Sequence, residues 1–260
     1  MIEEPYRWVE AIANRREYIE TQLATGSPIA ALSYRDGILL LTLGSARQKI
    51  FEIYDRVAMG AIGHPGDIER LRMAAIELAS TEGFTRSAAD VSLRRLAHYS
   101  LSPVLKTAFE QVYGAPYLAR MLFVEVGAKA EDDLFLRIDY DGAITASGGT
   151  FAQAQQHFGV LSGTHHSSTL MEALLKKEHR AGGNFDRAFR NALDVWSVGH
   201  MSLGSEAVLE LPPNDAVVAR RKELLKLSGV EAAVLERSGR AIRYRALSDE
   251  EIKTALRDLE

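Results

Sequence analysis

An Arg-Asp-Gly tripeptide at residues 35–37 separates two short apolar runs and limits the folds that this chain can adopt. The runs cover residues 29–34 and 38–43. Asp-Gly between such runs is the strongest short-range hairpin signal, because a two-residue hairpin turn needs residues that tolerate positive φ. Residues 50–53 and 57–62 form a second pair of apolar runs. The sequence therefore predicts two successive β-hairpins.

Helical patterns lie on either side of these hairpins. Residues 6–25 mix apolar and charged side chains at helical spacing, and Gly26 is suited to end that helix. After the second hairpin, apolar residues recur at helical spacing from about residue 68 to residue 82. We expect Asp67 to be the N-cap of this helix and Gly83 to end it.

The rest of the chain alternates between blocks of strands and blocks of helices. A helix is expected over residues 87–112, with a kink or break at Pro103 because proline lacks a backbone N–H. Another is expected over residues 151–158, and the last helix starts with a capping box formed by Ser248 and Glu251. Further strands are predicted at 119–126, 133–139, 143–146, 230–236 and 241–245. Further helices are predicted at 169–180, 186–196 and 248–259.

This order of elements favours an α+β protein over a parallel βαβ fold. We expect two stacked antiparallel sheets with a helical layer on each outer face, in a single domain that spans residues 1–260. Residues 1–25 would be an N-terminal segment and leading helix. Residues 176–227 fit the pattern least well, and we interpret them as a candidate insertion.

Composition argues against several kinds of site. The chain has no Cys, and its His residues at 157, 165, 166 and 179 lack a carboxylate at a fixed short spacing, so no metal or cofactor is predicted. Its 31 Lys and Arg against 35 Asp and Glu give a net charge of −4, which disfavours nucleic-acid binding. No apolar run approaches the roughly 20 residues that span a bilayer, and the acidic N-terminus does not resemble a signal peptide. We therefore expect a cytoplasmic protein without a membrane partner.

Several motifs, taken in order, resemble those of 20S proteasome subunits. They are Gly26-Ser27, the Asp36-Gly37 turn, the segment from Lys49 to Val57, Gly63 through Asp67, the Asp141-Gly142 turn, Ser147 to Thr150, and Tyr244-Arg245 before the final helix. The likeness covers about residues 17–170 and 230–258. It implies the N-terminal-nucleophile hydrolase fold, a four-layer αββα sandwich.

In the family that the chain resembles, only β-type subunits are catalytic. They cleave a Gly-Thr junction, and the exposed Thr uses its own amine as base, assisted by an acid and a lysine. Counting from the Asp36-Gly37 turn, Ser27 occupies the nucleophile position after Gly26, whereas Leu43 and Ser45 occupy the acid and lysine positions. The resemblance therefore implies a subunit that is not an enzyme. The alternative is a peptide or amide hydrolase in which cleavage after Gly26 exposes Ser27.

The chain is more similar to α-type subunits, which keep an uncleaved helix with a Glu-Tyr pair before the first strand. Glu17 and Tyr18 occupy that place here. In the family, this helix lies on the outer face of the ring, and the short segment before it in this chain resembles bacterial α subunits. The family also uses a lysine between neighbouring subunits to receive the C-terminal carboxylate of an activator. Lys49 occupies that position.

The resemblance thus implies a structural and gating subunit of a proteolytic complex. It would form a homo-oligomeric ring, a heptamer, stacked on rings of β-type subunits. It would limit the entry of unfolded chains and bind an ATP-dependent unfoldase or activator through pockets that include Lys49. A divergent member of the fold with a different partner stays open as an interpretation, because no motif in residues 176–227 indicates a function.

Overall fold

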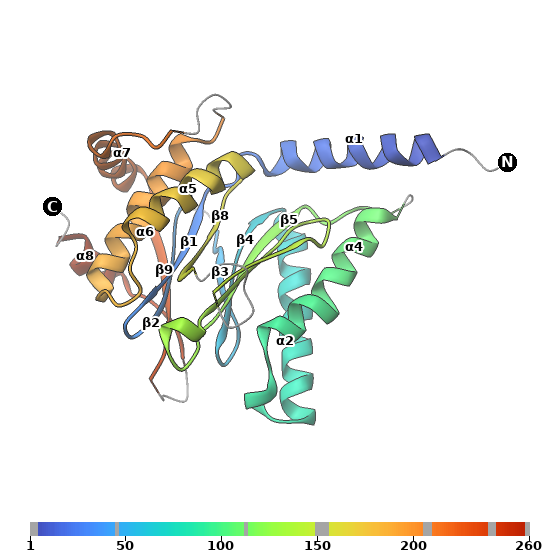
Figure 1. Ribbon diagram of the computed structural model, residues 1–260, viewed down its shortest axis with the longest axis horizontal. Coiled ribbons are helices and arrows are strands. Elements are labelled where there is room, and N and C mark those ends of the chain that lie inside the picture. The colour runs from blue at the N-terminus through green and yellow to red at the C-terminus, as the bar shows by residue number, and fades with distance from the viewer. Residues whose placement is uncertain are drawn as a thin grey trace.

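Two five-stranded antiparallel sheets lie face to face, with helices on both outer faces (Figure 1). The structure is a computed structural model that describes residues 5–44, 47–111, 114–148, 156–204, 210–238 and 243–257. The predicted α+β architecture, a four-layer αββα sandwich, is confirmed.

Both predicted hairpins are present, one in each sheet. Sheet A has the strand order β10-β9-β2-β1-β8, and sheet B has the order β3-β4-β5-β6-β7. The strands of sheet A are β1 (Ile29–Tyr34), β2 (Gly37–Leu43), β8 (Phe158–Leu161), β9 (Val230–Glu236) and β10 (Tyr244–Ala246). The strands of sheet B are β3 (Ile50–Tyr54), β4 (Val57–Gly63), β5 (Ala119–Glu125), β6 (Leu134–Ile138) and β7 (Ile144–Gly148). The hairpins are β1–β2 and β3–β4, each antiparallel.

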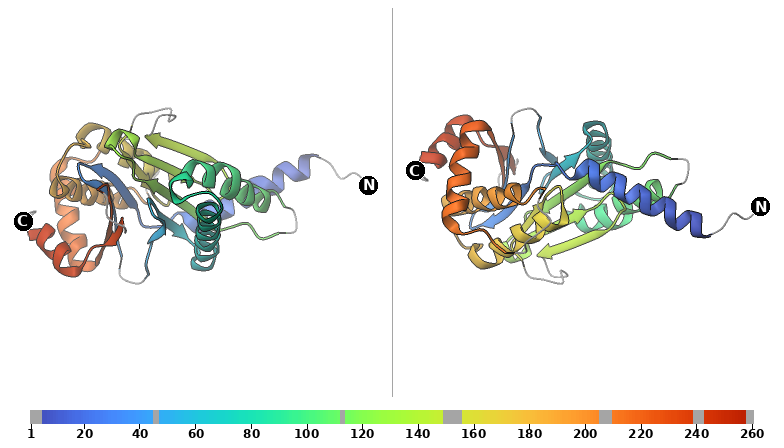
Figure 2. Two further views of the ribbon diagram at one scale, coloured as in Figure 1. Left: turned by 90° about the horizontal axis from the view of Figure 1, so that it is seen from below. Right: turned by 90° about the horizontal axis from the view of Figure 1, so that it is seen from above.

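The helices form two layers and one projecting arm. Sheet A is covered by α5 (His165–Glu178), α6 (Phe185–Met201), α7 (Asn214–Leu227) and α8 (Asp249–Arg257). Sheet B is covered by α2 (Pro65–Thr85), α3 (Leu93–Arg95), η2 (Leu96–Leu101) and α4 (Ser102–Glu110). Two short 3₁₀ turns are η1 (Ala88–Asp90) and η3 (Ala130–Asp132). The leading helix α1 (Pro5–Leu23) extends away from the sandwich in all three ribbon views (Figures 1 and 2).

Three apolar layers hold the sandwich together. Alternate residues of β1, such as Ile29 and Ala31, face sheet B, whereas Ala30 and Leu32 face the helices on sheet A. Because each sheet is covered on both faces, its central strands are apolar at nearly every position rather than at alternate ones. This explains why β1 and β2 are buried along their whole length.

The helix after the second hairpin begins earlier and ends later than predicted. His64 is the N-cap residue of α2 and Pro65 starts the helix, where its fixed φ and missing N–H cost nothing. The assignment of Asp67 as the N-cap is wrong, since its carboxylate accepts the backbone N–H of Leu118 at 3.0 Å. The assignment of Gly83 as the end is also wrong. A Cβ at Gly83 would collide with the Tyr54 hydroxyl, so this glycine permits the close approach of α2 to β3.

The interruption predicted at Pro103 is present as a π-helical segment. The residues of η2 form this wider turn, and α4 follows directly from Ser102. Proline at position 103 cannot donate the backbone hydrogen bond that an α-helix would need there. A π-turn just before it accommodates the missing bond, as such turns often do within helices.

One strand was not predicted at all. The expected helix over 151–158 is wrong at its end, because Phe158 begins β8, which pairs with β1. Residues 149–155 lie outside the described residues. They include most of the expected helix and, from the Gly-Gly-Thr motif, Gly149 and Thr150. A Cβ at Gly159 would lie 2.8 Å from Leu122 Cδ1, so glycine here lets β8 approach sheet B closely.

The C-terminal elements agree with the sequence. The strands β9 and β10 form the closing pair, and α8 begins after Ser248. Its capping box is confirmed: the Ser248 N–H donates to Glu251 Oε2 at 2.9 Å, and the Glu251 N–H donates to Ser248 Oγ at 3.4 Å. Within residues 176–227, Trp196 of α6 is buried in the core and its indole N–H donates to the Pro28 carbonyl at 2.6 Å. That this segment is an insertion stays a prediction.

Candidate functional site

The candidate site is a cavity at the end of the sandwich where β1 and β3 begin. Its volume is about 540 Å³. Ser27 lies two residues before the start of β1 and Lys49 lies directly before β3, so the segments that lead into the two sheets each contribute a polar side chain. The other residues that line it are Thr25, Gly26, Arg47, Gln48, Phe51, Ala61, Ile62, Gly63, Pro65, Ile68 and Glu69. The cavity therefore combines apolar walls with a small number of charged groups.

The Lys49 ammonium donates a hydrogen bond to the Ser27 hydroxyl. The expectation that no lysine would lie beside Ser27 is wrong. Counting along the chain pointed to residue 45, which lies outside the described residues, whereas the lysine in contact with Ser27 is Lys49. The Ser27 hydroxyl is also 3.4 Å from the carbonyl oxygen of Leu43, to which it donates.

Lys49 is half-buried, and its charge is subject to two opposing effects. Burial lowers the pKa of its amine, because a charged ammonium loses hydration inside the protein. The negative charge of Glu231 acts against this effect and favours the protonated form. Among the described residues, no carboxylate lies within ion-pairing distance of the Lys49 ammonium. Since an ammonium has three N–H donors, two stay available for a ligand.

The acid that N-terminal-nucleophile chemistry requires is absent at the expected place. Leu43 occupies that position and is 3% exposed, packed in the core beneath the helices of sheet A. In the unprocessed chain, the Ser27 nitrogen belongs to a peptide bond with Gly26, and the Gly26 carbonyl accepts the N–H of Gly163 at 3.1 Å. The site thus keeps a hydroxyl and an ammonium, but it has no acid at the expected position and, in this form, no free amine.

Glu231 is a part of this site that sequence reasoning missed. Its carboxylate accepts hydrogen bonds from the backbone N–H groups of Lys49 and Ile50, at 3.0 Å and 2.8 Å. The residue lies 182 positions after Lys49, on β9. Nothing in the local pattern of β9 distinguishes it from an ordinary charged residue near a strand end.

The other predicted residues, Glu17 and Tyr18, lie on α1 and do not line the cavity. Both are exposed, and 54% of the Tyr18 surface is open to solvent. The structure therefore separates them from Lys49. Their role in a ring or gate stays a prediction.

A buried arginine anchors α1 to the sandwich. Arg120 of β5 is 1% exposed, and its guanidinium pairs with Glu20 of α1 and with Asp139, each at 3.0 Å. It also donates to the Ser162 and Gly163 carbonyls, at 3.2 Å and 3.1 Å. This one side chain therefore connects α1, β5 and the segments that follow β6 and β8.

Glu20 is stabilised in its charged form by this cluster. Burial by itself would raise the pKa of Glu20, but hydrogen bonds with His165 and Tyr140 and the charge of Arg120 lower it to about 2. The carboxylate therefore stays ionised throughout the neutral and mildly acidic range. The leading helix is held by this charged contact together with an apolar cluster, in which Ile19 and Leu23 pack against Phe109 and Tyr140.

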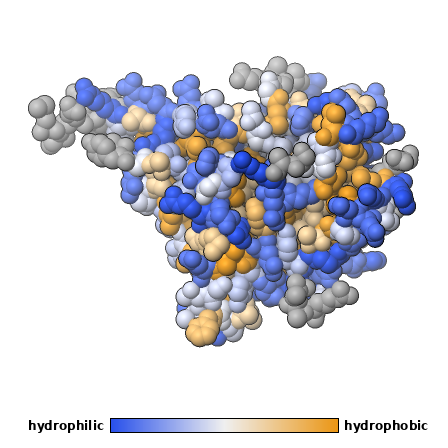
Figure 3. Space-filling model, turned by 180° about the vertical axis from the view of Figure 1, so that it is seen from behind, coloured by the Kyte–Doolittle hydropathy of each residue, from blue (hydrophilic) through white to orange (hydrophobic). Residues whose placement is uncertain are grey.

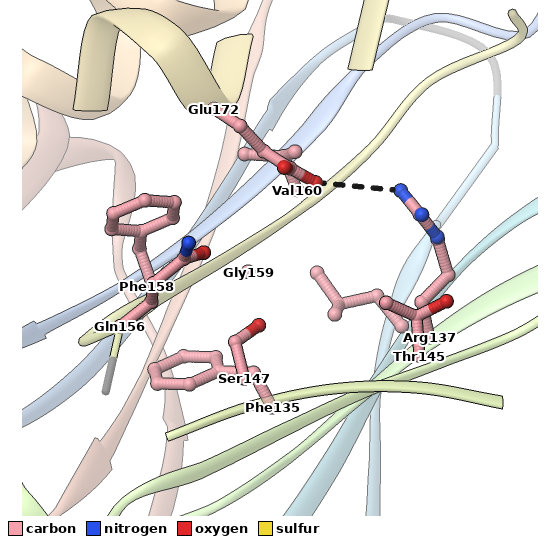
Figure 4. A pocket seen from close by; sticks show the side chains of 10 residues that line it. Phe135, Arg137, Thr145, Ser147, Gln156, Phe158, Gly159, Val160 and Glu172 are labelled. Atoms are coloured by element: carbon pink, nitrogen blue, oxygen red, sulfur yellow. Dashed lines mark ion pairs between the residues drawn. The ribbon is translucent and has the colours of Figure 1, made fainter. Parts of the chain in front are cut away.

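A second, much smaller cavity lies between the sheets near β8 (Figure 4). Its volume is about 20 Å³, which is room for about one water molecule. Arg137 and Glu172 face one another at its edge and form an ion pair at 3.6 Å. This cavity is too small for a ligand, so the cavity at Lys49 is the better candidate.

Residues 23–177 match the protein family described as proteasome subunit. The chain belongs to this family. A relative from Nocardioides sp., named proteasome subunit alpha, is 30% identical over 213 residues, which are 81% of this chain and 76% of the relative. Relatives of the same name from Actinosynnema mirum and Kineococcus radiotolerans are 28% and 29% identical, over 96% and 92% of this chain and 85% and 91% of their own lengths.

The family members that this chain is similar to are α-type proteasome subunits, so we assign the chain to that type. The α-type subunits are the non-catalytic members of the proteasome family, which agrees with a leucine, Leu43, at the position where the catalytic subunits have an acid. Across the described residues, no helix is long and apolar enough to cross a membrane. The same residues contain no cluster of three or more metal-ligating side chains.

Proposed function

We propose that this α-type subunit forms the outer ring of a 20S proteasome-like particle in the cytoplasm. The ring would be a homo-heptamer that stacks on β-type subunits and controls the entry of unfolded chains. Exposed apolar side chains support an assembled state, because contact with a neighbouring subunit would remove their apolar surface from water. They occur on α1, α2 and η2, and include Trp8, Val9, Leu78, Phe84 and Tyr99. Figure 3 shows apolar patches among the hydrophilic residues of the face opposite to that in Figure 1.

The cavity at Lys49 would bind the C-terminal carboxylate of an ATP-dependent unfoldase. The observation that carries this proposal is the half-buried Lys49 ammonium, which lines a cavity of about 540 Å³ and has no carboxylate partner among the described residues. A ligand carboxylate would form a charge-assisted hydrogen bond there. The apolar side chains of Phe51, Ile62 and Ile68 would contact the residues that precede the carboxylate.

Peptide binding tests this function. A fluorescein-labelled octapeptide with an apolar last residue is prepared with a free C-terminal carboxylate and, separately, with a C-terminal amide. Fluorescence anisotropy should show that the assembled protein prefers the carboxylate, and that Lys49→Met weakens binding of this form about tenfold or more. Lys106→Met is the control for loss of a positive charge, because Lys106 is an exposed lysine of α4 that does not line the cavity. Equal binding of the two peptides would contradict the proposal.

The second candidate function is hydrolysis by Ser27 after cleavage behind Gly26. The contact between the Lys49 ammonium and the Ser27 hydroxyl favours it, because a lysine beside the nucleophile is part of that chemistry. Leu43 at the position of the catalytic acid and the non-catalytic type of the relatives argue against it. Intact-mass measurement distinguishes the two functions, since processing would leave Ser27 as the first residue.

A further inference from the structure

Glu231 binds the backbone of Lys49 and of the next residue through hydrogen bonds. Its Oε1 atom accepts the N–H of Lys49 at 3.0 Å and that of Ile50 at 2.8 Å, and its Oε2 atom also accepts the Lys49 N–H at 3.0 Å. The Lys49 carbonyl in turn accepts the N–H of Ala61 on β4 at 3.0 Å. Both backbone groups of Lys49 are therefore bonded, one to each sheet.

Strands β9 and β10 of sheet A also hold the next residue, Ile50. Tyr244 of β10 donates its hydroxyl to the Ile50 carbonyl at 3.3 Å, and Gln48 donates its side-chain amide to the same oxygen at 2.7 Å. Glu231 itself lies within the pairing of β9 with β2, opposite Thr42. The first residue of β3 is thus held from sheet A, although β3 belongs to sheet B.

The Glu231 carboxylate favours the charged lysine without occupying its ammonium. Both carboxylate oxygens face backbone N–H groups, and no ion pair joins them to the Lys49 amine. Burial raises the pKa of Glu231, while the two N–H groups and the charge of Lys49 act to lower it. Other charged or titratable groups around Lys49 are Arg47 before β3, Glu69 on α2 and Tyr244 on β10. Of these, Glu69 is already paired with Arg72 at 2.7 Å.

We propose that Glu231 is a positioning residue for Lys49, which places the lysine at the cavity and keeps its ammonium charged and free to meet a ligand carboxylate. This inference rests on the proposed docking function for the ligand, but the effect on Lys49 itself does not need it. A carboxylate bonded directly to the ammonium would compete with the ligand. A carboxylate that is hydrogen-bonded to the adjacent backbone still places a negative charge near the ammonium. It leaves the N–H groups of the ammonium able to bind a ligand carboxylate.

Two measurements on the full-length protein test this role, with Glu231→Gln as the variant. Glu52→Gln is the matched control, because Glu52 is an exposed carboxylate on β3 three residues after Lys49. The first measurement is the rate of Lys49 acetylation by N-hydroxysuccinimidyl acetate between pH 6 and 11, read by peptide-mapping mass spectrometry. The second is anisotropy of the carboxylate octapeptide over the same range.

In Glu231→Gln, we expect the midpoint of Lys49 acetylation to move to lower pH, since the carboxylate no longer favours the protonated amine. We also expect the peptide to bind about tenfold more weakly at pH 7 and its affinity to fall at a lower pH than in wild type. Glu52→Gln should match wild type in both measurements. Thermal melting confirms that each variant is folded.

An unchanged acetylation midpoint in folded Glu231→Gln would overturn the inference, even if the peptide bound more weakly. Because acetylation does not involve the peptide, it tests Glu231 separately from docking. A different outcome would be that wild type binds the carboxylate and amide peptides equally, while the acetylation midpoint moves in Glu231→Gln. The docking function would then be wrong, and the positioning of Lys49 by Glu231 would be supported.

Discussion

At the scale of single residues, the molecule depends on a few charged side chains that each connect distant segments. Arg120 joins α1, β5 and the segments after β6 and β8, and it is almost fully buried. Removing one partner of a buried ion pair leaves the others charged and unpaired, which costs far more than losing an exposed pair. Arg120 should therefore contribute strongly to the position of α1, beside the apolar contacts of Ile19 and Leu23.

Arg120→Met tests that contribution. We expect the free energy of unfolding to fall by about 3 kcal/mol at pH 7, because Glu20 and Asp139 lose their partner. The difference should shrink as the pH falls from 4.5 towards 2, since the stabilisation from a carboxylate with a lowered pKa is lost over that interval. Urea unfolding at fixed protein concentration measures both effects.

Arg72→Met is the control, because the Arg72 pair with Glu69 lies at the surface. Exposed pairs of this kind contribute less than about 1 kcal/mol. Equal effects of the two substitutions would contradict the account of Arg120.

The Lys49 site shows what a sequence can predict about individual residues. Ser27 and Lys49 were each singled out, but their contact was not, because it depends on how the chain turns between β2 and β3. Glu231 was not found because its partners are the backbone N–H groups of residues 182 and 181 positions away. Backbone hydrogen bonds over such separations leave no pattern in the sequence.

At the scale of elements, the two sheets can approach one another only where small residues permit it. A Cβ at Gly159 of β8 would lie 2.8 Å from Leu122 and 3.1 Å from Phe135, both of which belong to sheet B. These neighbours are buried and cannot move freely. The contact between β8 and sheet B should therefore reject any larger side chain.

Gly159→Ala should lower the free energy of unfolding by about 1–3 kcal/mol, the usual cost of overpacking a core. Gly182→Ala is the matched control, because a Cβ there would meet no atom within 4 Å. Its effect should stay within about 0.5 kcal/mol. Differential scanning calorimetry compares the stabilities of the two variants. An unchanged stability of Gly159→Ala would contradict the close approach of β8 to sheet B.

The hairpins and most helices were predictable because their signals are local. Asp36-Gly37 marks a turn whatever surrounds it, and Ser248 and Glu251 complete a cap within one turn of helix. In contrast, β8 is four residues long, fully buried and contains a glycine. Such a run has no alternation of apolar and polar residues, so periodicity cannot distinguish it from part of a helix.

At the scale of the whole molecule, we expect an intact, non-catalytic subunit. The leading helix α1 projects from the sandwich and pairs with Arg120 through Glu20 (Figure 1). Cleavage after Gly26 would remove this helix together with its anchor. We therefore expect that the chain keeps α1 when it assembles into a ring.

Mass spectrometry of the purified protein under native and denaturing conditions tests whether the chain is an intact ring subunit. We expect an unprocessed chain near 28.7 kDa under denaturing conditions and a heptamer, or two stacked heptamers, under native conditions. A chain that begins at Ser27 would contradict this expectation, because the subunit would then carry a free N-terminal amine beside Lys49 and would be a hydrolase.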